Sequence, residues 1–211
     1  MKISEITDFL EQAYDVLNGH FFQGELPRVI ITVQSSPKAY GHYTKFDAWH
    51  EETKGYREIN IGAETLDRNI ENVCATLLHE MTHHYCDLHQ ICDVSRGGTY
   101  HNKRFKEQAE LHGLIIDYNN RIGWSVTSPS PALVDFVEGQ GWHGVNLARN
   151  GGQGASTGGT GGAGGSAGGA GRKPSSTRKY ICPCCGCSVR ATKTVNVGCL
   201  DCGVAMVVEE K

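Results

Sequence analysis

Residues 77–83 read Leu-Leu-His-Glu-Met-Thr-His, and this stretch decides how the surrounding chain folds. It lies in a segment from about Asn69 to Leu88 whose apolar residues recur at helical spacing. On a helix, His79 and His83 lie one turn apart on the same face, with side chains about 5 to 6 Å from each other. Two imidazoles at that spacing can share one metal ion, and we predict a zinc site on this helix.

Glu80, beside the two histidines, indicates catalysis as well as metal binding. Bound zinc lowers the pKa of water and polarises a carbonyl group, and a neighbouring carboxylate can take a proton from that water and pass it to the leaving amine. The alternative is a chance match to His-Glu-x-x-His. The long apolar-faced helix, and the extended segment before it that could pair with substrate, argue against chance. We therefore predict that Glu80 is the general base of a peptidase.

A third zinc ligand must come from elsewhere, and the sequence offers His89, His101 and Glu107. On a continuing helix, His89 would lie about 15 Å along the axis from His79, far beyond the length of a zinc bond. The pattern that turns such a helix sharply needs glycine at position 86, where this chain has Cys86. His101 follows a glycine turn near the start of the next expected helix and is a stronger donor than Glu107. We therefore favour His101.

The residues around this helix predict an α+β domain, with helices packed on a short mixed sheet. Residues 6–21 have the apolar spacing of an amphipathic helix. Three β-rich runs follow at residues 28–34, 39–44 and 56–61, and a further helix is expected from about Thr99 to His112.

The rest of the chain divides by composition. We expect the main domain at residues 1–124 and a partly ordered extension without a readable motif at 125–148. A flexible linker is predicted at 149–179, because residues 151–171 contain 12 Gly and no charged or bulky apolar side chain. A small module is expected at 180–211.

Two Cys-x-x-Cys pairs in this module predict a β-rich zinc ribbon, in which four thiolates hold a structural ion. A competing register uses Cys184 and Cys187, but the second cysteines of the favoured pairs are followed by Gly186 and Gly203, which allow a tight turn. The predicted structural ligands are Cys182, Cys185, Cys199 and Cys202. With the site on the helix, the chain is expected to hold two zinc ions, one catalytic and one structural.

Charge is distributed unevenly along the chain. Residues 1–150 contain 13 Lys and Arg against 20 Asp and Glu, whereas residues 172–200 contain six basic residues and no acidic one. This basic tail predicts contact with a polyanion such as single-stranded or damaged DNA, although it could also be merely a soluble tail. We find neither the apolar run of a secretory signal nor the ~20 apolar residues of a membrane span. We expect a cytoplasmic protein without membrane contact, whose nine cysteines are ligands or buried thiols.

The helix motif, together with Tyr-His-Asn-Lys-Arg-Phe at residues 100–105, resembles the SprT-like, Spartan-related family of zinc metallopeptidases. The resemblance covers residues 1 to about 124. It implies that His79, His83 and His101 bind the catalytic zinc, that Glu80 is catalytic and that Phe105 packs near the site. It also implies proteolysis of proteins crosslinked to DNA, and such proteins often carry a similar C-terminal ribbon. The alternative is a zinc-dependent DNA-binding or regulatory adaptor without turnover, but the intact Glu80 argues against it.

Overall fold

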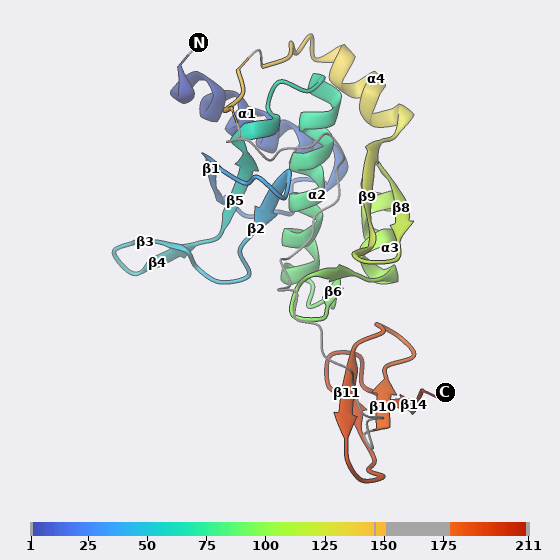
Figure 1. Cartoon of the computed structure of the whole chain (residues 1–211). Coiled ribbons are helices and arrows are strands. Elements are labelled where there is room, and N and C mark those ends of the chain that lie inside the picture. Colours follow the sequence, from blue (N-terminus) through green and yellow to red (C-terminus); the bar gives the residue numbers. More distant parts are fainter. Residues whose placement is uncertain (1, 146, 151–177, 210–211) are drawn as a thin grey trace.

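The computed structural model of the protein describes residues 2–145, 147–150 and 178–209 (Figure 1). The elements of the main domain are α1 (Ile3–Phe21), β1 (Ile30–Gln34), β2 (Gly41–Tyr43), β3 (Trp49–Glu51), β4 (Lys54–Tyr56), β5 (Glu58–Gly62), a 3-10 turn η1 (Ala63–Thr65), α2 (Ile70–Leu88), β6 (Val94–Ser95), β7 (Tyr100–His101), α3 (Lys103–Leu111), β8 (Leu114–Asn119), β9 (Gly123–Pro129) and α4 (Pro131–Gly139). This is the α+β arrangement expected from the sequence. Helix α2 lies between β2 of one small sheet and β9 of another (Figure 1).

The first sheet has the strand order β1-β5-β2. Strands β1 and β5 are parallel, with Ile31 opposite Ile59, and β2 is antiparallel to β5. The central strand β5 is buried along its whole length, and Ile59 and Ile61 belong to the main core. These strands fall within or beside the three expected β-rich runs. Strand β2 is left at the edge of this sheet, in contact with α2.

Helix α2 is buried on most of its surface, because sheets and helices surround it. Leu77, Leu78 and Met81 are fully buried. The helix ends at Leu88, and Gln90 then adopts a positive φ of 56°, which turns the chain away from the helix axis. Buried α2 is thus a rigid support for the side chains that it carries.

The second sheet has the order β6-β7-β9-β8, and it corrects the helix expected from Thr99. That helix, α3, begins only at Lys103, because the side chain of Asn102 accepts hydrogen bonds from the backbone N–H groups of Arg104 and Phe105. Residues 100 and 101 instead form β7, which pairs with β6 and meets β9 at residue 123. His101 therefore lies on a short strand directly before α3.

Residues 125–145 of the expected extension contribute to the main domain. Most of β9 lies in this segment and pairs with β8, and Ser130 then caps α4 by accepting a hydrogen bond from the N–H of Leu133. Val137 and Val145 belong to the same buried core as residues of α1 and α2. The domain boundary expected at residue 124 falls inside β9.

The C-terminal module contains β10 (Arg178–Ile181), β11 (Ser188–Ala191), β12 (Gly198–Cys199), β13 (Val204–Ala205) and β14 (Val207–Val208). A sheet of order β11-β10-β14 and the hairpin β12-β13 enclose a small core of Tyr180, Met206 and cysteines. The module lies beside β6, where the Ser95 hydroxyl donates a hydrogen bond of 3.0 Å to the carbonyl of Cys185 (Figure 1). Most of the expected linker, residues 151–177, lies outside the described residues. In the described ranges, no helix has the length and apolarity that a membrane span requires.

Candidate metal centre and active site

Three imidazoles converge between α2 and β7. The Nε2 atom of His101 lies 3.2 Å from Nε2 of His79 and 3.0 Å from Nε2 of His83. The two α2 histidines reach the same point because they are one helical turn apart, and β7 brings the third from 18 residues further along the chain. The structure thus brings together all three histidines that the sequence analysis selected for the catalytic zinc.

This donor set fits a zinc ion. A tetrahedral ion bonded to imidazole nitrogens at about 2.0–2.1 Å holds those nitrogens roughly 3.3–3.4 Å apart, close to the spacing found here. Three nitrogen atoms that face one another cannot all be satisfied by mutual hydrogen bonds, since each neutral ring has only one donor and one acceptor. A cation at their centre would accept all three lone pairs.

The surroundings favour neutral, ligating imidazoles. Burial, and to a smaller extent the proximity of His83 and His101, lowers the pKa of His79 well below its usual value. Burial, and to a smaller extent the proximity of His83, lowers the pKa of His101 to about 3. These two rings therefore keep a free lone pair at neutral pH.

A single aromatic ring packs against all three imidazoles. Phe105 is fully buried, and its ring centroid lies 4.6 Å from the ring centroid of each of His79, His83 and His101. The packing role that the family resemblance implied for Phe105 is therefore present. Because Phe105 lies in the first turn of α3, packing of this helix against α2 also fixes the distance between the ligands.

Glu80 lies at the contact between α2 and the edge strand β2. Its side chain is buried, and a Cβ atom built on Gly41 would lie only 3.1 Å from Glu80 Oε1. Glycine at position 41 thus lets the backbone of β2 approach the carboxylate closely. Burial raises the pKa of Glu80 to about 7, because the charged form loses its hydration.

The other candidate ligands lie elsewhere. His89 is the C-cap residue of α2, and its Nε2 lies 3.4 Å from a carboxylate oxygen of Glu25; Glu107 is exposed on α3. His84 is buried on a different side of α2, where its Nδ1 lies 3.2 Å from the hydroxyl of Tyr14 and its ring stacks on Tyr43. His84 is therefore a packing residue.

Two polar residues at the histidine site were missed by the sequence analysis. Asp93 Oδ2 lies 2.5 Å from Nδ1 of His83, and Thr127 Oγ1 lies 2.7 Å from Nδ1 of His79. Neither residue belongs to a recognisable motif: Asp93 lies in the loop just after α2, and Thr127 lies in β9, far from the helix in sequence. In the sequence, the feature that could have pointed to Asp93 is its position as an acidic residue in the loop that joins α2 to β6.

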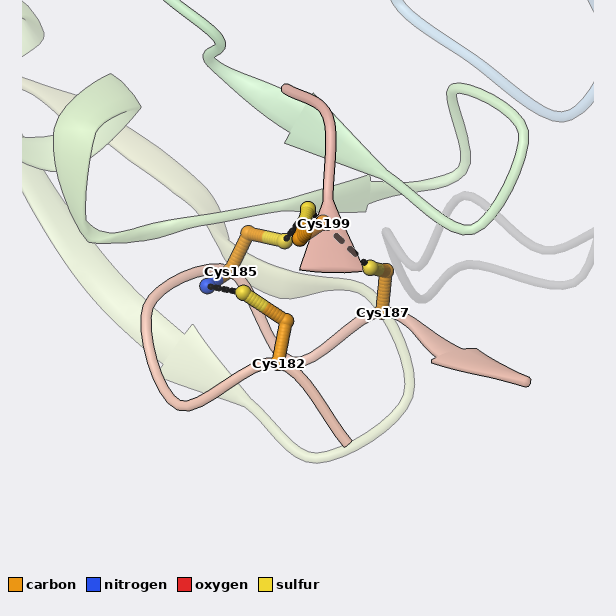
Figure 2. Close-up of side chains that lie close together, drawn as sticks. All are labelled: Cys182, Cys185, Cys187 and Cys199. Carbon is orange, nitrogen blue, oxygen red and sulfur yellow. Dashed lines mark hydrogen bonds between the residues drawn. The ribbon is translucent and has the colours of Figure 1, made fainter. Parts of the chain in front are cut away.

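The C-terminal module brings its cysteine sulfurs together (Figure 2). The four sulfurs that lie within 4.8 Å of one another belong to Cys182, Cys185, Cys187 and Cys199, so Cys187 stands where the sequence analysis expected Cys202. Cys202 is nevertheless within hydrogen-bonding reach of Cys185 and Cys199. The glycines after the two knuckles both have positive φ, 72° at Gly186 and 64° at Gly203, as a tight turn requires. The cluster suits zinc, with Cys187 and Cys202 as alternatives for its fourth ligand.

Comparison with known proteins agrees with this geometry. The sequence model of the SprT-like family matches residues 10–120, more than half of the chain, whereas no curated protein and no solved structure matches. The matched range contains α2 with its two histidines, β7 with His101, and Phe105. With a metallopeptidase-like domain whose three histidines and neighbouring cysteine cluster fit zinc, this chain belongs to the SprT-like family.

Proposed function

We propose that the protein is a zinc-dependent endopeptidase that acts on proteins bound or crosslinked to DNA. One observation carries the proposal: the Nε2 atoms of His79, His83 and His101 face a common point, and a buried carboxylate follows the first of them on the same helix. A purely structural metal site needs no general base. The membership in the SprT-like family supports the same reaction class.

The residues of the chain divide the work of peptide hydrolysis between them. A zinc ion held by the three histidines would activate a water molecule and polarise the scissile carbonyl group. Glu80 accepts a proton from that water and later donates it to the leaving amine.

The edge strand β2 supports an extended peptide as the substrate. Its backbone is paired with β5 on one side only, and at Gly41 it lies directly against Glu80. An extended chain that added a strand at this edge would receive main-chain hydrogen bonds without any requirement on its sequence. This mode suits a peptidase that accepts many different proteins.

The basic C-terminal module supports DNA as the partner. Lys179 of β10 and Arg190 of β11 are directly opposite each other; Lys179 pairs with Glu209 at 2.9 Å, and Arg190 is exposed beside this pair. Arg178 and Lys193 are exposed on the same module, and the stretch that holds these cations has no acidic residue. Phosphate contacts of this kind give binding that is largely independent of sequence and strongly dependent on salt.

Substitution Glu80→Gln tests the catalytic proposal. The variant should keep its zinc and lose cleavage of a DNA-bound basic protein, measured by gel electrophoresis with single-stranded DNA and with or without a chelator. Glu71→Gln, which removes a carboxylate from the first turn of the same helix, should cleave normally. Cleavage by Glu80→Gln at the normal rate would exclude Glu80 as the general base. If the unaltered protein cleaves nothing, the adaptor alternative holds.

Truncation after residue 177 tests the DNA proposal separately. The shortened chain should lose most of its affinity for single-stranded DNA, and the salt dependence of binding should become shallower. Its histidine site should still bind zinc. Unchanged DNA affinity would move the nucleic-acid contact to the main domain.

A further inference from the structure

Each α2 ligand has a polar partner on the nitrogen that faces away from the proposed metal. Asp93 is fully buried, and its Oδ2 lies 2.5 Å from Nδ1 of His83 while its Oδ1 lies 2.5 Å from Nζ of Lys45. The backbone of Asp93 is also held, because its carbonyl accepts a 3.0 Å hydrogen bond from the N–H of Asn102. The carboxylate therefore has little freedom to leave His83.

The contacts of Asp93 indicate which nitrogen of His83 carries the hydrogen. Its other carboxylate oxygen forms an ion pair with Lys45, so Asp93 takes part as a charged group. An ionised carboxylate can only accept hydrogen bonds, so the hydrogen on the imidazole must be at Nδ1. The lone pair of His83 is then at Nε2, on the side of the other two histidines.

Thr127 occupies the corresponding position at Nδ1 of His79. The Thr127 hydroxyl donates a hydrogen bond of 3.3 Å to the carbonyl of Ser125, which uses its single hydrogen. With that hydrogen on Ser125, the hydroxyl oxygen accepts in the contact of 2.7 Å with Nδ1 of His79, which is the direction that zinc binding at Nε2 of His79 requires. Nε2 of His79 is left with a free lone pair, as in His83.

His101 has no such partner. Among the described residues, Nδ1 of His101 is the one buried side-chain nitrogen or oxygen that makes no hydrogen bond. Its position depends instead on the backbone, through the hydrogen bond from its N–H to the carbonyl of Ile122, and on packing against Phe105. The three ligands are thus supported by a charged acceptor, a neutral acceptor and no acceptor.

We propose that Asp93 and Thr127 are positioning residues, which hold His83 and His79 in the tautomer and orientation that bind zinc, with Asp93 making the larger contribution. The inference rests on the zinc site of the proposed function, but not on proteolysis. A charged acceptor strengthens the donor power of the imidazole more than a hydroxyl does, because charge-assisted hydrogen bonds are roughly twice as strong as neutral ones. Such outer partners typically contribute 10- to 100-fold to metal affinity.

The test is the zinc dissociation constant of the histidine site in the full chain, measured by competition with a chromophoric chelator. His101→Ala identifies which zinc equivalent belongs to the histidine site and which to the cysteine cluster. Asp93→Asn, which keeps the shape and removes the charge, should weaken zinc binding by about 10- to 100-fold. Thr127→Val, which removes the acceptor, should weaken it by roughly 10-fold.

Two matched controls separate positioning from general damage. Thr127→Ser keeps the hydroxyl group and should restore normal zinc affinity. Asp87→Asn removes a carboxylate one helical turn beyond His83 that instead contacts Tyr43 and Arg57, and it should leave zinc affinity unchanged. Circular dichroism of the zinc-free proteins should show that every variant is folded.

The outcomes are distinct from those of the catalytic test. Normal zinc affinity in folded Asp93→Asn and Thr127→Val would overturn the proposal, as would equal losses in Asp87→Asn and Asp93→Asn. If Asp93→Asn does not fold, the comparison of Thr127→Val with Thr127→Ser decides alone. A protein that binds zinc with this pattern but cleaves nothing would refute the proposed function and leave the positioning roles supported.

Discussion

The close approach of β2 to Glu80 leads to a sharp expectation for Gly41→Ala. The added Cβ would lie 2.9 Å from the backbone oxygen of Asn60, 3.1 Å from Glu80 Oε1 and 3.2 Å from Glu80 Cγ. The oxygen of Asn60 belongs to the neighbouring strand and cannot move without disturbing the sheet. The strand must therefore shift, the carboxylate must turn away, or both.

The magnitude follows from these contacts. Overpacking of this kind costs about 1–3 kcal/mol, against which alanine returns about 0.4–1 kcal/mol by restricting the unfolded chain. We expect the free energy of unfolding to fall by about 1–2 kcal/mol. Cleavage should fall more steeply, by roughly 100-fold, because a displacement of about 1 Å in a catalytic group has that effect. Zinc content should not change, since the atoms nearest the new methyl group belong to Asn60 and Glu80 and not to a zinc ligand.

The assay combines denaturant unfolding, zinc analysis and cleavage of a DNA-bound protein on the same preparations. Gly19→Ala is the matched control: Gly19 is exposed in helix α1 and has no neighbouring atom within 4 Å of a Cβ, so alanine there should stabilise the protein by about 0.5–1 kcal/mol. Wild-type stability and wild-type cleavage in Gly41→Ala would refute the reasoning. A loss of zinc together with activity would also refute it, because the effect would then lie in the metal site.

Four other substitutions probe the two metal sites and the turn beside them. His89→Ala should leave the zinc content of the histidine site unchanged, because His89 pairs with Glu25; a loss of zinc would restore the ligand pattern that the geometry disfavours. Cys187→Ser should lower zinc binding by the cysteine cluster more than Cys202→Ser does, and zinc stoichiometry in which Cys202→Ser is the worse variant would favour the ligand set expected from the sequence. Gly123→Ala should destabilise the protein by about 2–4 kcal/mol in denaturant unfolding, because this residue has a φ of 75° and a Cβ would overlap a carbonyl oxygen of β7; an unchanged midpoint would contradict this.

The helical part of the zinc site could be predicted from the sequence because it depends on local geometry. Residues four apart on a helix share a face whatever surrounds them, so His79 and His83 were paired before any tertiary contact was known. The apolar spacing of α2 and the β-rich runs of the first sheet are local in the same sense, because burial imposes their periods. The two Cys-x-x-Cys knuckles and their glycines also follow short-range rules.

The remaining features of the site depend on contacts between distant segments. Residues 100–101 form a strand where the first turn of a helix was expected. Asn102 caps α3 and so sets where that helix begins, and the backbone before it pairs with β6 and β9. Spacing left several candidates for the third ligand, and the pairing of β7 brings His101 to the other two histidines. The acceptors Asp93 and Thr127 have no sequence signature, since a carboxylate or hydroxyl becomes a partner only through its position in space. Short-range periodicity can be recognised in the sequence because it depends on neighbouring residues. The meeting of distant groups depends instead on how the sheets and helices pack.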